Sequence, residues 1–200
     1  MVTEQVSGGN ELGSRIEQIV AAGRRCFSHY GVQKTSMDDI AREAGLTRAS
    51  VYRYFPNKNA LVKEVTQGQT KRFLDEVTRR TARIEGLSAQ IEEIARMTIE
   101  FMREEPINVA MARSDPDAIA RVLTTNSSPL LADSMETIVP LIEAAVARGE
   151  VRPDLDVLRA AEWITRMVYS LVLTPAVTFD GDDPAMQQAF IREFLVPGLD

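Results

Sequence analysis

The stretch that decides the fold is TSMDDIAREAGLTRASVYRYFPNKNALVKEV, residues 35–65. It holds two short segments with apolar residues at helical spacing, separated by a turn that includes Gly45. Ser36 precedes the first segment and Thr47 precedes the second, and hydroxyl side chains at such positions accept hydrogen bonds from the free amides of a helix start. Two short helices joined by a tight turn with a glycine predict a helix-turn-helix.

The second helix of this pair is expected to have one buried face, because Val51 and Phe55 lie one turn apart and can pack inward with Leu61. Its other side chains then point outward, and in a helix-turn-helix that surface enters the major groove of DNA. Small residues allow close approach, arginine reaches guanine edges or phosphates, and tyrosine hydroxyls can bind phosphates. The predicted DNA-binding residues here are Thr47, Arg48, Ala49, Ser50, Tyr52, Arg53 and Tyr54.

Further DNA contacts are predicted on either side of this helix. Pro56 ends it, and Asn57 is placed to cap a linking helix over residues 57–80. Lys58 stands in the first turn of that helix, where backbone amides also favour phosphate. Thr35 and Ser36 add hydroxyls at a helix start. The alternative is that the tyrosines pack in a core and the charges form a solvated face.

The distribution of charge favours the DNA-binding interpretation. Residues 13–63 hold nine Lys/Arg against four Asp/Glu, a net charge of +5. The whole chain carries −6, so the remainder carries −11. A basic N-terminal module on an acidic body is the pattern of a phosphate-binding head attached to a larger scaffold.

The rest of the chain predicts an all-α protein, since it shows helical periodicity in several segments and no convincing alternating strands. We expect a disordered tail over residues 1–12 and a three-helix, helix-turn-helix domain over residues 13–60. Residues 61–200 are expected to form a helical bundle for ligand binding and dimerisation. The predicted helices span residues 14–30, 36–44, 47–55, 57–80, 91–105, 130–148, 155–174 and 184–196.

Composition argues against an enzyme. His29 is the only histidine and Cys26 the only cysteine, so a metal cluster or a serine triad lacks parts, and no glycine-rich phosphate loop is present. We therefore predict no catalytic residues, no metal and no cofactor. No uncharged apolar run reaches the ~18 residues of a membrane span, which predicts a soluble, cytoplasmic protein without membrane contact.

The body is rich in methionine and large apolar residues, which fit irregular cavities as well as an ordinary bundle core. A pocket is predicted from Met97, Thr98, Phe101, Met111, Trp163, Met167 and Tyr169, with Thr98 and Tyr169 as polar anchors. Two broad apolar faces near the C-terminus are expected to pair with a second copy of the chain. The predicted interface residues are Ala161, Ile164, Val168, Leu171, Val172, Phe190 and Phe194.

Residues 35–65, with the preceding helix end RRCFSHYGV, resemble the TetR family of bacterial transcriptional regulators. The shared pattern is Asp-Ile-Ala, Ala-Gly, Tyr-x-x-Phe, x-Lys and x-x-Leu, and it covers about the first third of the chain. The resemblance implies a homodimer with N-terminal DNA-binding domains, a C-terminal ligand-binding domain and dimerisation through the last two helices. It also implies operator contacts at Thr47, Arg48, Ala49, Tyr52, Tyr54 and Lys58. Tyr54 stands where other members often carry histidine.

The resulting hypothesis is a ligand-responsive transcriptional regulator of the repressor type. It would leave a palindromic operator in double-stranded DNA when a hydrophobic or amphipathic small molecule binds its body. Repression is expected because most members of the family that the chain resembles are repressors. The competing hypotheses are an enzyme and a ligand-binding dimer that has lost DNA binding.

Overall fold

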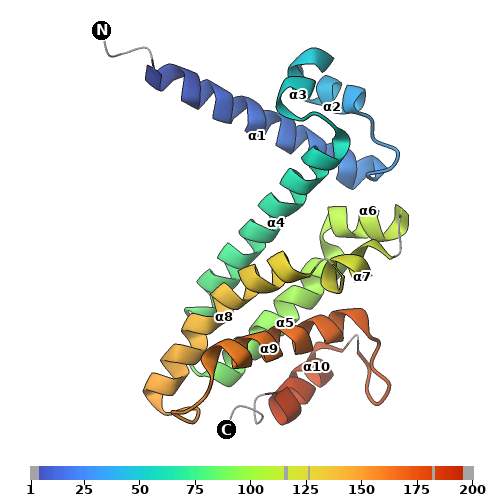
Figure 1. Ribbon diagram of the computed structural model, residues 1–200. Coiled ribbons are helices and arrows are strands. Elements are labelled where there is room, and N and C mark those ends of the chain that lie inside the picture. The colour runs from blue at the N-terminus through green and yellow to red at the C-terminus, as the bar shows by residue number, and fades with distance from the viewer. Residues whose placement is uncertain (1–4, 115–116, 126, 182, 196–200) are drawn as a thin grey trace. The chain divides into compact units, whose positions relative to one another are not determined.

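The computed structural model describes residues 5–114, 117–125, 127–181 and 183–195 (Figure 1). These residues form helices joined by turns and contain no strand, which confirms the all-α prediction. The helices are α1 (Gln5–Tyr30), α2 (Met37–Glu43), α3 (Arg48–Tyr54), α4 (Lys58–Thr81), α5 (Leu87–Glu104), α6 (Pro106–Ser114), α7 (Ala118–Leu123), α8 (Ser128–Arg148), α9 (Val157–Leu173), α10 (Pro184–Phe190) and a π-helical turn, η1 (Ile191–Leu195).

The chain divides into two compact units, each with its own hydrophobic core. The first comprises Met1–Lys71 and Pro106–Pro116, and the second comprises Arg72–Glu105 and Asp117–Asp200. This division differs from the expected boundary at residues 60/61 in two ways. The boundary lies inside α4, and α6 joins the first unit although the chain reaches it through α5.

In the first unit, α1 packs against α2 and α6, and α2 packs against α3. Its core includes Phe27 of α1, Ile40 of α2, Val51 of α3, Leu61 of α4 and Ile107 of α6, and none of these side chains is exposed. Five helices therefore contribute to the core beneath the helix-turn-helix.

Cys26 lies in this same core and is 3% exposed. Removal from water disfavours the charged thiolate and raises the pKa of the thiol. Cys26 is thus a packed core residue and not an accessible thiol.

Helix α1 begins nine residues earlier than the sequence pattern indicates, at Gln5 instead of Ser14. The expected tail over residues 1–12 is thus helical from residue 5, and residues 1–4 lie outside the described part of the chain. Gly8 and Gly9 disfavour a helix, but here the helix only extends a packed segment. Extension avoids the costly nucleation step, so weak local propensity does not stop it.

The predicted helix starts around the turn are confirmed. The Ser36 hydroxyl accepts a hydrogen bond from the Asp39 amide at 3.2 Å, and the Asp39 carboxylate accepts one from the Ser36 amide at 3.0 Å. Thr47 accepts from the Ser50 amide at 3.2 Å, and Asn57 accepts from the Ala60 amide at 2.9 Å. These caps satisfy amides that the helices leave free.

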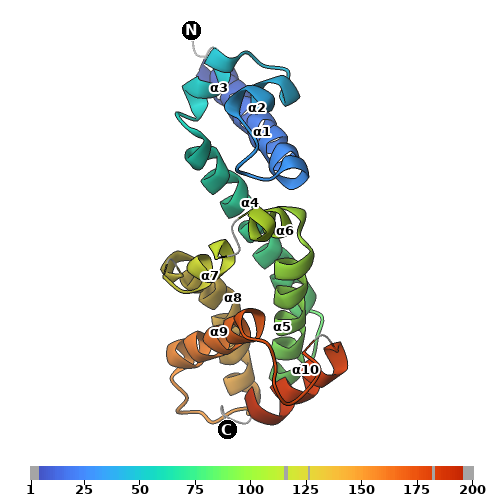
Figure 2. The same ribbon diagram turned by 90° about the vertical axis from the view of Figure 1, so that its right-hand side faces the viewer.

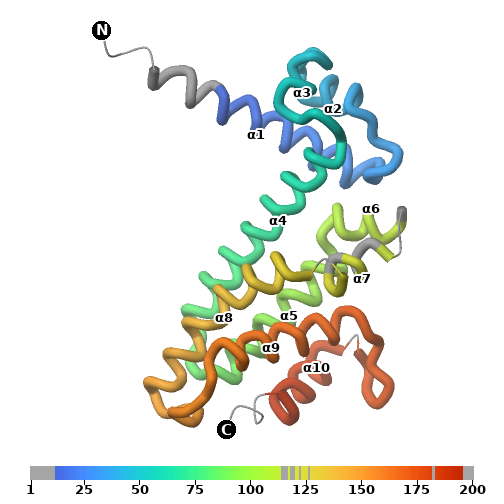
Figure 3. Tube along the Cα trace, in the orientation of Figure 1, coloured from blue at the N-terminus to red at the C-terminus, as the bar shows by residue number. Residues whose placement is uncertain are grey.

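In the second unit α5 is the central helix. It packs against α8, α9, α10 and η1, and Figure 2 shows α9 and α10 on either side of it. Helices α8 and α9 also run side by side, as the trace in Figure 3 shows. Ile91, Ile142 and Ile164, one from each of α5, α8 and α9, are fully buried in the shared core.

Gly149 caps the end of α8, directly after the predicted helix end at residue 148, with φ of +73° in the left-handed region. Its amide donates to the Val146 carbonyl at 3.0 Å. Gly149→Ala is expected to lower the free energy of unfolding by about 1 kcal/mol, because a Cβ disfavours this backbone conformation. Urea unfolding followed by circular dichroism measures the change.

Gly13→Ala provides the matched control. Gly13 lies within α1, its φ is not positive, and a Cβ there would meet no atom within 4 Å. The same substitution should leave the free energy of unfolding unchanged or raise it by up to about 1 kcal/mol. Equal destabilisation by both substitutions would contradict the conformational explanation.

Candidate nucleic-acid interface

The turn between α2 and α3 presents one face of α3 outward. Val51 is the residue of α3 that is fully buried, and Gly45 takes a φ of +65° in the turn before it. Arg48, Ala49, Tyr52 and Arg53 are exposed, whereas Ser50 and Tyr54 are half-buried. The inward and outward faces predicted from spacing are therefore observed, with the half-buried Ser50 and Tyr54 as the exceptions.

Tyr54 packs against the core of the first unit through its ring. The guanidinium of Arg53 lies 5.0 Å from the ring centroid and donates to the Tyr54 hydroxyl at 3.2 Å. This arrangement fixes the ring while leaving its hydroxyl near an exposed cation. The expectation that Tyr54 points wholly outward is corrected, since part of its ring completes the core.

Arg48 is oriented from two sides. Its Nε lies 3.1 Å from one Asp38 carboxylate oxygen, and its Nη1 donates to the other at 3.3 Å. Its guanidinium also lies 5.3 Å from the centroid of the Tyr52 ring. Tyr52 and Asp38 together raise the pKa of Arg48, so the group stays charged. Sequence spacing did not indicate Asp38 as a partner of Arg48, because the two residues lie on different helices.

Thr35 does not belong to the exposed surface. The residue is 2% exposed, and its hydroxyl donates to the Gly31 carbonyl at 2.8 Å, with the Cys26 carbonyl at 3.3 Å. Its hydroxyl therefore closes the end of α1, and the structure does not support the expected DNA contact. A hydroxyl at a helix start that lies close to the end of the preceding helix can either bond to that helix end or contact DNA. Sequence spacing alone does not distinguish these two roles.

Ser36 and Thr47 remain exposed, but their hydroxyls serve first as caps. Ser36 donates to the Asp39 carboxylate at 2.6 Å, and the hydroxyls of Thr47 and Ser50 lie 2.9 Å apart. Hydroxyls accept as well as donate, so each retains limited capacity for another partner.

Lys58 also has an internal partner set. Its ammonium group donates to the carbonyl oxygens of Val32, Gln33 and Thr35, all in the connection between α1 and α2. The predicted phosphate contact would require this group to leave at least one of those carbonyls.

The predicted pocket residues do not all belong to one core. Met111 packs against the core of the first unit, whereas Met97 and Trp163 belong to the core of the second. Met167 is 38% exposed on α9. Met111 thus belongs to a different core from Met97 and Trp163, because methionine composition does not reveal which core a helix joins.

Three of the predicted pocket positions have defined internal contacts in the second unit. Phe101 stacks on Phe73 with ring centroids 4.3 Å apart. Tyr169 is 7% exposed, and its hydroxyl lies 2.8 Å from that of Ser134. Burial raises the pKa of Tyr169, which keeps the hydroxyl neutral. Thr98 is buried and donates to the Ile94 carbonyl at 2.7 Å, so its hydroxyl is satisfied within α5.

The predicted dimer residues on α9 need a larger correction. Ala161 and Ile164 are fully buried and Val168 is 2% exposed, all within the core of their own chain. They face α5 and α8, which cover the broadest apolar side of α9. Among the described residues near this end of the chain, the exposed large apolar side chains are Leu158, Met167, Val177, Met186 and Phe194.

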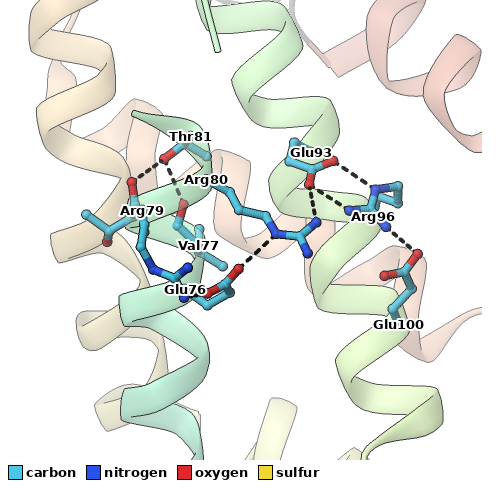
Figure 4. Close-up of polar contacts among 9 residues, drawn as sticks. Glu76, Val77, Arg79, Arg80, Thr81, Glu93, Arg96 and Glu100 are labelled. Atoms are coloured by element: carbon cyan, nitrogen blue, oxygen red, sulfur yellow. Dashed lines mark hydrogen bonds and ion pairs between the residues drawn. The ribbon is translucent and has the colours of Figure 1, made fainter. Parts of the chain in front are cut away.

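A charged network joins α4 to α5 in the second unit (Figure 4). Arg80 of α4 donates to Glu76 at 2.9 Å and to Glu93 of α5 at 3.2 Å. Arg96 binds the same Glu93 at 2.6 Å and also pairs with Glu100. The two arginines hold the pKa of Glu93 below its usual range. The sequence holds one signal for this network, the Glu76–Arg80 pair at i, i+4 spacing, and none for its extension to α5.

The described residues offer no candidate metal site and no candidate membrane span. They contain no group of three or more His, Cys, Asp or Glu side chains able to hold a metal ion. None of the helices in this part of the chain is long and apolar enough to cross a membrane.

Similar folds occur among solved transcriptional regulators. A TetR-family regulator from Pectobacterium atrosepticum superposes with a TM-score of 0.73 at 23% identity, covering 95% of this chain and 96% of the other. FadR from Bacillus subtilis, solved in complex with stearoyl-CoA, superposes with a TM-score of 0.65 at 17% identity, covering 92% and 99%.

Sequence comparisons cover most of the chain. A regulator from Mycobacterium tuberculosis H37Rv, described as the uncharacterized HTH-type transcriptional regulator Rv1255c, is 31% identical over 186 residues, covering 90% of this chain and 83% of its own. The HTH-type transcriptional repressor KstR2 of Mycolicibacterium smegmatis is 26% identical, covering 78% and 80%. The profile described as bacterial regulatory proteins, tetR family, matches residues 19–65, and the tetracyclin repressor-like C-terminal domain matches residues 85–195. The chain belongs to the TetR family of transcriptional regulators.

Proposed function

We propose that this regulator is a homodimeric repressor that binds a palindromic operator through α3 and leaves it when an apolar or amphipathic small molecule binds the second unit. The observation that carries the proposal is the outward face of α3, with Arg48, Ala49 and Tyr52 exposed on a capped helix-turn-helix. The +5 charge of residues 13–63 supports a phosphate-rich partner.

The roles within α3 follow from chemistry and position. Ala49 leaves room at the N-terminal end of α3, where a recognition helix approaches base edges. Arg48, aligned by Asp38 and Tyr52, is placed to read a guanine or bind a phosphate. Tyr52 and Arg53 are proposed to hold the DNA backbone, with smaller contributions from Ser36, Thr47, Ser50 and Tyr54. These backbone contacts would set the register without reading sequence.

Repression and an apolar effector are supported by relatives. KstR2 is a named repressor, and the fold of B. subtilis FadR accommodates stearoyl-CoA. Here the second unit offers a largely apolar interior, in which the buried Tyr169 and the half-buried Ser134 form a polar pair. We propose that the effector binds among Met97, Phe101 and Trp163, with that polar pair as its anchor.

A coupling route runs along α4. The Arg80–Glu93 contact ties the end of α4 to α5, so an effector that moves α5 also moves α4. The start of α4 holds the connection before α2 through Lys58. The effector must bind the operator-incompetent arrangement more tightly, because equal binding to both arrangements shifts nothing.

The first experiment tests the recognition helix. A duplex is selected from a random pool with the wild-type protein, and affinities are measured by fluorescence anisotropy. Arg48→Ala should weaken binding by about 1–3 kcal/mol and relax preference at one position of each half-site. Ala49→Leu should block docking because its side chain occupies the groove-facing surface.

Arg152→Ala is the control for loss of an exposed arginine, since Arg152 lies in the second unit. It should bind the selected duplex like the wild type. Recovery of no duplex from the pool would contradict the proposed function, and unchanged affinity in both α3 variants would contradict the role of α3.

The second experiment tests assembly. Light scattering at micromolar concentration should give twice the 22.2 kDa chain mass. The proposed interface uses the exposed residues Met167 and Phe194, with the half-buried Leu171, Val172 and Phe190 beside them. Met167→Asp combined with Phe194→Asp should shift the mass towards a single chain, because two charges would be buried in the interface.

Leu12→Asp is the matched control, because Leu12 is 51% exposed but lies in the first unit. It should leave the measured mass unchanged. A wild-type protein that scatters as a single chain would rule out the homodimer.

The third experiment tests release. Stearoyl-CoA is titrated into the complex with the selected duplex while the fluorescence of Trp163, the only tryptophan, is followed together with DNA anisotropy. Both signals should change with one midpoint, and coenzyme A without an acyl chain should change neither.

Arg48→Ala separates ligand binding from DNA binding in this assay. The variant should retain the Trp163 response because it leaves the second unit intact. A Trp163 response with no loss of DNA affinity in the wild type would contradict coupling. Release by coenzyme A alone would contradict an apolar effector site.

A further inference from the structure

Lys58, in the first turn of α4, donates hydrogen bonds to three backbone carbonyl groups of another segment. Its Nζ donates to the Val32 carbonyl at 2.8 Å, the Thr35 carbonyl at 3.0 Å and the Gln33 carbonyl at 3.2 Å. All three acceptors belong to residues 31–36, between the end of α1 and the start of α2. The side chain itself is half-buried.

The count of donors matches the count of acceptors. A lysine ammonium has three N–H donors and no acceptor, so three carbonyls use its full capacity. The acceptors lie outside the helices, where carbonyl groups have no partner in a helical ladder and still require one. A phosphate contact would therefore exchange an existing charge-assisted bond for a new one.

The position of Lys58 in α4 supports the same conclusion. A cation in the first turn of a helix is disfavoured by the helix dipole, whose positive end lies there. The three carbonyl oxygens supply negative partial charge that offsets this effect. The arrangement thus places a lysine where the helix alone would not favour one.

The connection held by Lys58 leads directly into the helix-turn-helix. Thr35, one of the three acceptors, precedes the Ser36–Asp39 capping box that starts α2. Thr35 is also fixed from the other side by its hydroxyl, which donates to the Gly31 carbonyl. The start of α4, the end of α1 and the start of α2 therefore meet at one lysine.

We propose that Lys58 is a positioning residue that ties α4 to the connection before α2, and that it supports DNA binding through this tie and not through a phosphate. The proposal rests on the proposed DNA-binding function and assigns Lys58 a different part in it. Movement of the start of α4 would pass to the start of α2 through this side chain, in addition to the core that α4 shares with α2 and α3.

The test compares the salt dependence of DNA binding in three variants, with the duplex selected by the wild type. Lys58→Met keeps the aliphatic stem and removes the donors. Lys58→Arg keeps the charge, but its planar, diverging donors do not converge on the three carbonyls. Lys63→Met is the control, because Lys63 is an exposed lysine on the same helix.

With a tie, Lys58→Met and Lys58→Arg should both lose about tenfold in affinity at fixed salt, a loss typical of hydrogen bonds to a charged group. The slope of log affinity against log salt should stay at the wild-type value in Lys58→Met. With a phosphate contact, that slope would fall by about 0.9 for each contact removed, and Lys58→Arg would bind nearly like the wild type. A lower slope in Lys58→Met together with near-wild-type binding by Lys58→Arg would overturn the proposal.

Amide hydrogen exchange, measured without DNA, tests the contact between Lys58 and residues 32–35 independently of DNA binding. Amide hydrogen exchange over residues 31–37 should be faster in Lys58→Met than in the wild type and unchanged in Lys63→Met. Unchanged exchange in Lys58→Met would overturn the tie even if the protein binds DNA. Failure to select any duplex would count against the proposed function, while exchange would still report on Lys58. If Lys58→Met does not fold, Lys58→Gln, with two donors, serves in the same comparison.

Discussion

The apolar side chains of α4 are shared between two hydrophobic cores. Leu61 and Val65 are buried in the first core, and Val77 is buried in the second. Because both cores require this one helix, neither unit can lose its part of α4 without leaving apolar surface in water. The contacts at the two ends of α4 are directional hydrogen bonds, from Lys58 at one end and from Arg80 at the other. They orient the helix, whereas burial holds it.

The first unit also depends on a segment far away in sequence. Ile107 of α6 is fully buried in the core that includes Phe27 and Val51. The helix that carries Arg48, α3, is therefore supported by residues that the chain reaches only after passing through α5. A domain defined from residues 13–60 alone would lack part of its core, and its helices would be correspondingly less stable.

Local features of this protein were predictable because they depend on neighbouring residues. The caps at Ser36, Thr47 and Asn57 follow from short-range hydrogen bonding, and Gly149 follows from the left-handed end of a helix. Long-range features were not predictable in the same way. Periodicity places Ala161 and Ile164 on one face of α9, but it does not say whether that face meets its own chain or a partner. The burial of Thr35 and the carbonyl partners of Lys58 likewise depend on how three chain segments meet.

The burial of Cys26 has a practical consequence for spectroscopy. The chain has no other thiol, and this one is 3% exposed with its pKa raised by desolvation, so a maleimide dye has little reactive thiolate to attack. A cysteine introduced at an exposed position can then be labelled selectively without removing the native residue. Reaction at Cys26 itself requires the core formed by α1 and its neighbours to open. The native thiol is therefore a built-in reporter of local unfolding beneath the helix-turn-helix.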